Sequence, residues 1–396
     1  MKKVYLGCFL TPNIEKEYCK ESKNQYVISA TTFQRAFLSF FKELGDVSII
    51  NAPDIGSWPK RSSWLNFTGG EDIYEGVPCR HVPFLNLTYF KRFSIYRSLY
   101  NALDKWASKD NDEKLIIVYS IMYPYIKAAV KIKKKYPNIK ICCIVLDLPE
   151  YFGDTNTLMD KLTDKTRDIY KLTLEVDSFV LLTKQMAKAL KIKDRPWILM
   201  EGIYKPNNIH GQGKISKTIL YTGKLDARFG LRELVDSFIN VSDKDAQLWI
   251  CGNGLDKDYV IDASKKDSRI KYYGVVKQEE VFKMQQQAAI LVNPRRPEGE
   301  YTKYSFPSKT MEYLASGTPT IMYHLPGMPD EYLPFVELIN EKSPTGLRDS
   351  LEKMLTSSQK ELDDFGAKAR DFILQTKTAN IQMVRFNQFI KMLYEK

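Results

Sequence analysis

Residues 115–146 read LIIVYSIMYPYIKAAVKIKKKYPNIKICCIVL, which predicts a strand, a helix and a second strand in succession. The two apolar runs, 115–119 and 139–146, do not alternate with polar residues, so each fits a strand covered on both faces. The segment 124–135 between them has the length and pattern of a helix. This arrangement indicates a parallel sheet in an α/β domain.

The same alternation extends toward both ends of the chain. On the N-terminal side we expect strands at 3–10, 47–50 and 178–182, and helices at 30–44 and 185–190. Residues 52–80, rich in Pro, Gly, Ser and Trp, are predicted to be irregular. Residues 202–216 are rich in Gly, Pro, Asn and Ser and are typical of a linker between domains.

A second series of strands and helices follows the linker. We expect strands at 218–221, 247–251, 270–273, 289–292 and 318–322, with helices at 231–240, 256–264, 278–287 and 308–316. The end of the chain, 343–396, is predicted to be helical. The chain of 396 residues is long enough for two domains. We therefore predict an α/β protein with two Rossmann-like domains.

The bulk composition limits the partners and the compartment. A formal net charge of +11 suits an anionic partner, which could be a nucleotide, a phospholipid surface or a nucleic acid. The six cysteines form no C-x-x-C pair, which favours a reducing cytosol. The apolar run 4–10 is too short for a signal peptide, and no run reaches the ~18–20 apolar residues of a membrane span. Any membrane contact is therefore expected to be peripheral.

The stretch YTGKLDARFG, residues 221–230, predicts a strand that runs into a turn and then a helix. Gly223 allows a ligand to approach the backbone closely. Lys224 and Arg228 place positive charge beyond the carboxyl end of the strand, where ligands bind open α/β sheets. Such charge would stabilise a departing diphosphate. An ordinary loop with solvated basic residues is the alternative.

The stretch SFPSKTMEYLASGTP, residues 305–319, predicts a helix that begins beside Pro307 and ends at Gly317. Ser308 and Lys309 fall in its first turn, where unpaired backbone N–H groups can bind phosphate. Glu312 lies on the same face as Ser308 and could accept hydrogen bonds from a ribose. A well-capped surface helix is the alternative.

Other candidate motifs are weaker. The glycines around Asn253 resemble the start of a dinucleotide fingerprint, but Lys257 stands where its third glycine should be, so a plain turn is the preferred interpretation. Three D-x-D pairs are expected to form turns and to bind no metal, and the three histidines are scattered. These aspartates and histidines are Asp110/Asp112, Asp243/Asp245, Asp256/Asp258, His81, His210 and His324.

Two further features lie in the N-terminal half. Asp147 and Glu150 follow an apolar strand, where they could orient an acceptor hydroxyl or cap a turn. The segment 86–106 is predicted to be a helix with an aromatic stripe of Tyr89, Phe93, Tyr96, Tyr100 and Leu103, and with basic residues elsewhere. This helix could contact an anionic membrane, or it could pack on the sheet as a crossover helix.

The order of these motifs resembles the bacterial family 4 glycosyltransferases, and in particular the polysaccharide-assembly members that carry Ser-Phe-Pro-Ser-Lys. The resemblance covers about 217–323. It implies a GT-B fold, in which domains 1–205 and 206–376 face a cleft and a last helix in 377–396 crosses back to the N-terminal domain. It also implies transfer with retention, without a metal or another cofactor.

The resemblance assigns roles to individual residues. Lys224 and Arg228 would neutralise the leaving diphosphate, Gly274 and Val275 would meet the nucleotide base, and Glu312 would bind the ribose. Tyr304 occupies the position of the first Glu of the family's E-x7-E signature, so the resemblance does not show how the sugar is held. The full expected donor site is Gly223, Lys224, Asn253, Gly274, Val275, Tyr304, Ser305, Ser308, Lys309 and Glu312.

These observations predict a cytoplasmic hexosyltransferase that uses a UDP-sugar, or alternatively a GDP-sugar, and a saccharide or lipid-linked saccharide acceptor. Peripheral contact with the inner face of the membrane fits such an acceptor. A sugar-nucleotide epimerase or another Rossmann-type enzyme is the first alternative. A basic nucleic-acid-binding protein is the second, but the chain shows no reader module, so no nucleic-acid partner is expected.

Overall fold

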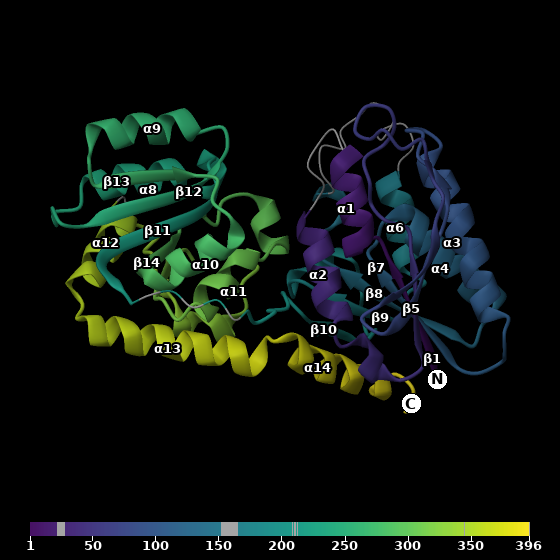
Figure 1. Cartoon of the computed structure of the whole chain (residues 1–396). Helices are drawn as coiled ribbons and strands as arrows, with labels where there is room; N and C mark the ends of the chain where they lie inside the picture. The colour runs from purple at the N-terminus through teal and green to yellow at the C-terminus, as the bar shows by residue number, and fades with distance from the viewer. Residues whose placement is uncertain are drawn as a thin grey trace. The chain divides into compact units, whose positions relative to one another are not determined.

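The computed structural model describes residues 1–21, 28–151, 165–207, 209, 211, 213–343 and 345–395. The chain divides into two compact units. Unit 1 consists of Met1–Ile203 and Ala379–Lys396, and unit 2 consists of Tyr204–Thr378. Each unit has a central sheet of mainly parallel strands with helices packed against it (Figure 1). The predicted α/β class with two Rossmann-like domains is confirmed.

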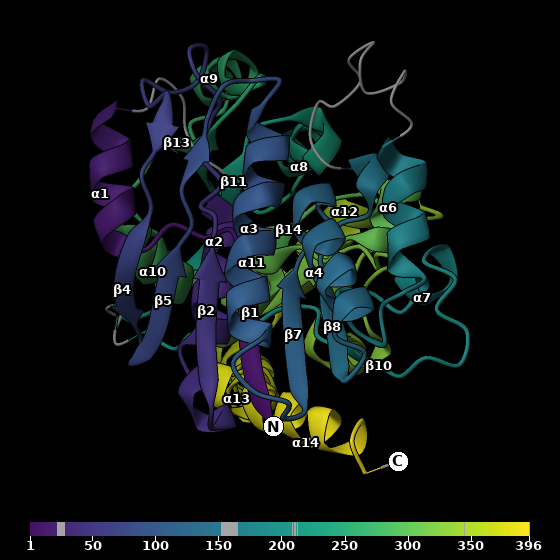
Figure 2. The ribbon, with the colours of Figure 1, turned by 90° about the vertical axis from the view of Figure 1, so that its right-hand side faces the viewer.

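The sheet of unit 1 has the strand order β10-β9-β8-β7-β1-β2-β5-β4 (Figure 2). Its middle strand β1 (Lys2–Gly7) pairs in parallel with β7 (Lys114–Tyr119) and β2 (Val47–Asn51). Because β1 and β7 are buried along almost their whole length, their apolar runs do not alternate with polar residues. The remaining strands are β8 (Ile139–Val145), β9 (Ser178–Leu181), β10 (Trp197–Leu199), β5 (Val77–His81) and β4 (Gly70–Tyr74).

The helices of unit 1 cover this sheet. They are α1 (Pro12–Glu21), α2 (Ile28–Leu38), α3 (Lys91–Ala107), α4 (Tyr123–Lys135), α6 (Lys165–Thr173), α7 (Gln185–Ala189) and α14 (Ala379–Met392). Helices α3 and α4 lie in front of the sheet in Figure 2. The C-terminal helix α14 returns to unit 1, where the rings of Phe386 and Phe37 of α2 lie 5.1 Å apart.

The prediction that residues 52–80 are irregular is wrong for the second part of this range. Strands β4 and β5 form an antiparallel hairpin there, and β5 extends the parallel sheet beside β2. Val77, Cys79 and His81 are buried, whereas Pro78 and Arg80 are exposed. This alternation is the pattern of an outer strand, and the surrounding turn residues hid it in the sequence. The short strands β3 (Asn66–Phe67) and β6 (Phe84–Leu85) form a separate antiparallel pair.

The helix predicted at 30–44 is interrupted. Helix α2 ends at Leu38, and Phe41–Leu44 form a separate 3-10 turn that ends at Gly45, with φ at +93°. The rings of Phe37 and Phe41 still pack on Tyr5 of β1, with centroids 5.7 and 5.8 Å away. The apolar spacing therefore marked the buried face correctly, although the helix is shorter than predicted.

The sheet of unit 2 is parallel throughout and has the order β13-β12-β11-β14-β15-β16. Its strands are β11 (Ile215–Lys224), β12 (Gln247–Asn253), β13 (Ile270–Gly274), β14 (Ala288–Asn293), β15 (Thr320–Met322) and β16 (Glu337–Leu338). Its helices are α8 (Leu231–Ile239), α9 (Lys257–Lys266), α10 (Gln278–Gln287), α11 (Ser308–Ala315), α12 (Gly346–Thr356) and α13 (Gln359–Thr376). Buried side chains pack in two clusters, one with α8, α9 and α12 and the other with α10 and α11.

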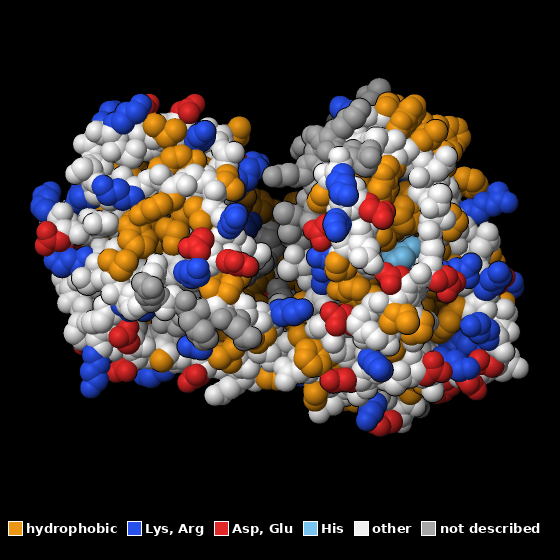
Figure 3. Space-filling view, in the orientation of Figure 1, with side chains coloured by type: hydrophobic (Ala, Val, Ile, Leu, Met, Phe, Trp, Pro, Cys, Tyr) orange, Lys and Arg blue, Asp and Glu red, His pale blue; other side chains and the backbone are white. Residues whose placement is uncertain are grey.

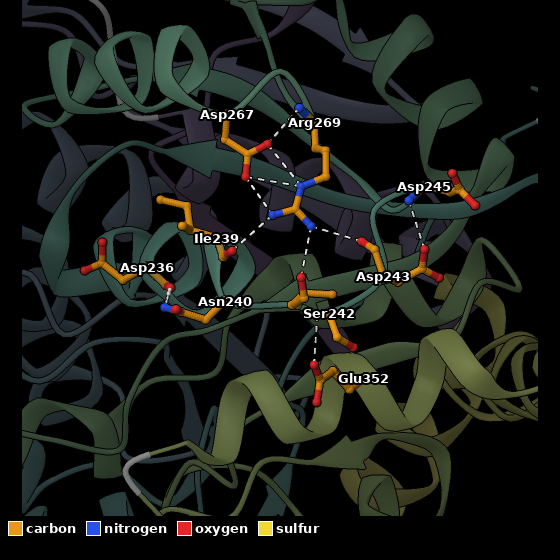
Figure 4. A network of polar contacts seen from close by, with 10 residues as sticks. Asp236, Ile239, Asn240, Ser242, Asp243, Asp245, Asp267, Arg269 and Glu352 are labelled. Carbon is orange, nitrogen blue, oxygen red and sulfur yellow. Dashed lines mark hydrogen bonds and ion pairs between the residues drawn. The ribbon is translucent and has the colours of Figure 1, made fainter.

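A polar network joins the segments that precede β12 and β13 (Figure 4). The guanidinium of Arg269 donates to the carbonyl oxygens of Ile239, Val241 and Asp243 at 2.9 to 3.0 Å. It also pairs with Asp267 at 2.7 Å, and this pairing lowers the pKa of the carboxyl group. The network lies at the amino ends of the strands, so it stiffens the edge of the sheet opposite the predicted donor residues.

Candidate functional site

The carboxyl ends of β11, β12 and β13 lie side by side in unit 2. The ladder pairs Gly223 with Gly252, Lys224 with Asn253, and Cys251 with Gly274. Val275 follows directly and is 78% exposed. The structure therefore brings these predicted donor residues to one edge of the parallel sheet, which is where open α/β sheets bind ligands.

Two glycines keep this edge free of side chains. A Cβ added to Gly252 would lie 1.7 Å from the carbonyl oxygen of Gly223. A Cβ added to Gly223 would lie 1.9 Å from Nζ of Lys309, and the φ of Gly223 is +152°. The backbone of Gly223 therefore lies against both the backbone of Gly252 and the Lys309 ammonium group. A side chain at either glycine would push these groups apart.

Helix α11 is attached to the end of β11 by two side chains. Nζ of Lys309 donates to the carbonyl oxygen of Thr222. The hydroxyl of Tyr313, which is buried, accepts from the backbone N–H of Thr222 at 2.9 Å. Because of these contacts, the first turn of α11, with exposed Ser308, lies beside the carboxyl end of the central strand.

Burial changes the acid–base behaviour of two residues on this helix. It lowers the pKa of Lys309 to about 8, and the nearby Glu312 carboxylate partly offsets this effect. It raises the pKa of Glu312, which the Lys309 ammonium group partly offsets. For both groups desolvation outweighs their mutual attraction, so an anionic ligand near Lys309 would gain from a cation that water screens weakly.

The two residues predicted to be catalytic have different surroundings. Lys224 is exposed at the end of β11. Arg228 is bound to Asp226, with Nη2 2.7 Å from the carboxylate, and its backbone N–H donates to the same group at 3.0 Å. These bonds lower the pKa of Asp226 to about 2. Arg228 therefore shares its positive charge with a neighbouring carboxylate, whereas Lys224 has no ion-pair partner within the described ranges.

Arg295 was missed by the sequence reasoning. It follows β14, the strand beside β11, and its Nη2 donates to Oγ of Ser305 at 3.0 Å. Its guanidinium lies 5.7 Å from the ring centroid of Phe229, so it faces the loop between β11 and α8. The sequence feature that could have indicated this residue is the pair of arginines directly after the apolar strand and Pro294. The neighbouring Arg296 instead pairs with Glu233 at 2.6 Å.

Tyr304 and Ser305 connect this arginine to α11. Tyr304 ends a 3-10 turn, Glu300–Tyr304, and both residues are half-buried. The segment runs from β14 to the start of α11 and brings Ser305 against Arg295. The segment that links β14 to α11 therefore carries Tyr304, Ser305 and Ser308, and it borders the end of β11.

The predicted acceptor residues lie in unit 1. Asp147 is exposed after β8, and Glu150 accepts hydrogen bonds from the Tyr170 hydroxyl at 2.8 and 3.0 Å. Within the described ranges, Glu150 holds helix α6. The side chain of Asp147 keeps accessible surface, but desolvation of its carboxyl group raises its pKa.

Each D-x-D pair contains an aspartate that binds a cation of the chain. Asp110 pairs with Lys114, Asp243 with Lys217, and Asp256 with Arg232, at 2.6 to 3.0 Å. Among the residues with a described position, no three or more His, Cys, Asp or Glu side chains are grouped as a metal site would require. His81 is buried and His324 is exposed, whereas His210 lies outside the described residues.

Comparison with known families matches residues 216–357 to the model described as "Glycosyl transferases group 1". This range covers most of unit 2 and contains every predicted donor residue. The match identifies it as a glycosyltransferase domain, and the chain as an enzyme of that class. No match was found among curated proteins.

Solved structures match over the whole chain. Sucrose-phosphate synthase from Thermosynechococcus elongatus is 12% identical, with a TM-score of 0.66 and 100% of both chains covered. HepE from Anabaena, solved with UDP, is 12% identical with a TM-score of 0.63, and 100% of both chains is covered. The lipopolysaccharide outer core galactosyltransferase WaaB is 14% identical with a TM-score of 0.62, and 99% of both chains is covered. The chain therefore has the GT-B fold.

Proposed function

We propose that this chain transfers a sugar from a nucleotide-diphosphate donor, with UDP favoured over GDP, to a saccharide or lipid-linked saccharide. We further propose that it retains the anomeric configuration, as the resemblance to the family 4 enzymes implies. Unit 2 binds the donor and unit 1 the acceptor. HepE and the pneumococcal transferase GtfA, which share the fold, were solved with UDP, and this favours a uridine nucleotide.

The observation that carries the proposal is the gathering of cationic groups around the end of β11. Lys224 ends this strand, Lys309 contacts its Thr222 carbonyl, and Arg295 follows the adjacent strand. The first turn of α11 adds backbone N–H groups beside them. A diphosphate gains negative charge as the glycosidic bond breaks, so fixed positive charge here stabilises the leaving group.

The remaining donor residues match the other parts of a nucleotide sugar. Glu312 lies one turn after the start of α11, where a carboxylate can accept from the ribose hydroxyls. Gly274 and the exposed Val275 end the outer strand β13, where they can line the base. The diphosphate therefore lies between the ribose and base on one side and the reacting sugar on the other.

The same arrangement favours transfer without a metal ion. The lysines and the helix start supply the charge that a divalent cation would bring to a diphosphate. The D-x-D aspartates that could have held such a cation are instead paired with Lys114, Lys217 and Arg232. Leaving-group stabilisation thus rests on the cations of the chain.

Calorimetric titration with UDP, GDP and UMP tests the donor assignment. We expect UDP to bind more tightly than UMP, because only UDP carries the second phosphate that Lys309 and α11 would hold. Absence of binding by both diphosphates, with the protein folded, would contradict the proposal.

We also propose that helix α3 contacts an anionic membrane from the cytoplasmic side. The predicted aromatic stripe is only partly right, because α3 packs on the unit through buried Ile95, Leu99 and Leu103. Tyr89, Phe90 and Phe93 instead remain exposed, at 77%, 58% and 62%.

The charge of this region suits an anionic surface. Residues 86–103 contain no acidic residue, and their two exposed basic residues are Arg92 and Arg97, whereas Lys91 is turned inward to the Ile55 carbonyl and to Asp54. Exposed aromatic rings with basic neighbours are typical of a segment that lies in the headgroup plane, where each basic residue contributes on the order of 1 kcal/mol. Within the described ranges, no helix is both long and apolar enough to span a bilayer.

Sedimentation with vesicles of phosphatidylglycerol and phosphatidylcholine tests this contact. Changing Phe90 and Phe93 together to Ser should reduce the bound fraction severalfold. Ile73→Ser is the control, because Ile73 is a large apolar residue of unit 1 that is even more exposed, at 73%, but lies on β4. Equal sedimentation of the double variant and the wild type would remove α3 as the contact.

A further inference from the structure

Unit 1 contains a cavity of about 400 Å³ that none of the proposed donor residues lines. Its walls come from the start of α1, the segment 64–69 and strands β4 and β5. Figure 3 shows a hollow on this face, where a histidine side chain lies beside acidic side chains. The volume is within the range of small-molecule pockets.

Two aromatic side chains form one wall of the cavity. Trp64 and Phe67 are stacked, with ring centroids 6.2 Å apart, and both are half-buried. Tyr18 makes an edge contact with Trp64, with ring centroids 5.6 Å apart, and the Phe84 ring lies 5.2 Å from that of Phe67. Rings that are packed against other aromatic side chains and remain partly exposed offer a flat apolar surface to a ligand.

Other residues that line the cavity are acidic. Glu17, Glu71 and Asp72 line the cavity. Among the described residues no Lys or Arg belongs to the lining, although Arg80 approaches Glu71 from outside it at 3.9 Å. Burial lowers the pKa of His81, so this histidine adds little positive charge at neutral pH. The cavity is therefore negative, although the whole chain carries a net charge of +11.

One buried polar group in the wall has no partner. The hydroxyl of Thr11 is fully enclosed and makes no hydrogen bond with any described residue, and the side chain is 1% exposed. A buried hydroxyl without a partner costs about 1–3 kcal/mol, so such groups usually meet a ligand or an ordered water. Because this oxygen is enclosed, it does not itself reach the cavity, and polar contacts with a ligand fall to the other lining residues.

We propose that this cavity binds the acceptor saccharide, and that it selects neutral or amino sugars over acidic ones. The rings of Trp64 and Phe67 pack on the apolar face of a pyranose, and the carboxylates accept from its hydroxyls. A protonated amino sugar gains further from the negative lining, whereas a uronic acid is repelled. The inference rests on the proposed function, because it names the acceptor class of the same enzyme.

Calorimetry on the full chain at pH 7 tests this with three disaccharides. The probes are cellobiose, the glucosamine disaccharide and digalacturonate, and UDP is titrated in parallel. We expect the glucosamine disaccharide to bind most tightly and digalacturonate at least tenfold more weakly. Trp64→Ala should weaken saccharide binding about 3- to 10-fold. Trp197→Ala, which removes an exposed ring elsewhere in unit 1, should leave it unchanged.

The charge selection is tested by a second variant. Changing Glu71 to Gln and Asp72 to Asn should reduce the preference for the glucosamine disaccharide over digalacturonate, whereas Glu43→Gln, an exposed control, should retain it. A Tm and a far-UV circular dichroism spectrum like those of the wild type show that each variant is folded, and unchanged UDP affinity shows that unit 2 is intact. Wild-type binding of UDP but of no disaccharide, or tightest binding of digalacturonate, would overturn the acceptor site alone. Saccharide binding without UDP binding would instead contradict the proposed donor function.

Discussion

The affinity for nucleotide diphosphate should fall as the pH rises above 8, and Lys309 should be the cause. Burial lowers the pKa of this lysine to about 8, because the charged form is partly removed from water beside the end of β11. Its ammonium group is the form that attracts a diphosphate. Binding of the diphosphate therefore stabilises the protonated form of Lys309. The affinity is highest at pH values below the pKa that Lys309 has in the unliganded protein.

The size of the effect follows from the titration of one group. With a pKa of about 8, Lys309 is protonated in about nine-tenths of the molecules at pH 7 and in about one-tenth at pH 9. If only the protonated form holds the diphosphate, the dissociation constant rises about tenfold between these pH values. The affinity should be nearly constant from pH 7 downward to about pH 6.5, where the nucleotide itself begins to titrate.

Calorimetry with UDP at pH 7, 8 and 9 measures this change in the wild type and in Lys309→Met. The variant keeps a side chain of similar length but has no charge, so it should bind more weakly at pH 7 and lose the pH dependence. The ratio of the two affinities at each pH cancels the ionisation of UDP itself. A ratio that stays constant from pH 7 to pH 9 would refute the role assigned to Lys309.

Three other outcomes are expected. Glu312→Ala and Lys224→Ala should each weaken UDP binding about tenfold, the effect of a lost charge-assisted hydrogen bond, while their Tm stays near that of the wild type; unchanged affinity in both would remove the donor assignment. Turnover should survive excess EDTA, and a loss that Mg²⁺ or Mn²⁺ restores would show a metal requirement. Arg269→Ala should lower the free energy of unfolding by about 2–4 kcal/mol, because it leaves Asp267 half-buried without its partner. Lys265→Ala, which breaks an exposed pair, should lower it by less than about 1 kcal/mol, and equal losses in chemical denaturation would argue against the network in Figure 4.

The sequence predicts the central strands well and the outer strands of unit 1 poorly. Strands β7 and β8 are buried on both faces, so each is a continuous apolar run that can be recognised in the sequence. Strands β4 and β5 combine exposed and buried residues within a region full of turn residues. Their pairing depends on β2, which lies more than twenty residues earlier, and local patterns do not record such contacts.

The same distinction applies to the candidate site. The Pro-Ser-Lys start of α11 and the glycine after β11 are local signals, and the structure brings both to one edge of the sheet. The bond from Lys309 to Thr222 joins residues 87 positions apart, so the low pKa of this lysine could not be predicted. The pairing of Arg228 with Asp226 is local, because the two residues are only two positions apart. The motif nevertheless did not indicate that this carboxylate binds the guanidinium.

The central claim is that unit 2 binds a nucleotide sugar through Lys309, Glu312 and the end of β11. Its most direct test is the release of nucleoside diphosphate from a panel of UDP- and GDP-sugars, measured by chromatography, for the wild type and for a Lys309→Met, Glu312→Gln double variant. We expect the wild type to release the diphosphate from at least one donor, and the folded double variant to release it at least a hundredfold more slowly. Equal release by both proteins, or none from any donor by the wild type with acceptor present, would contradict the account.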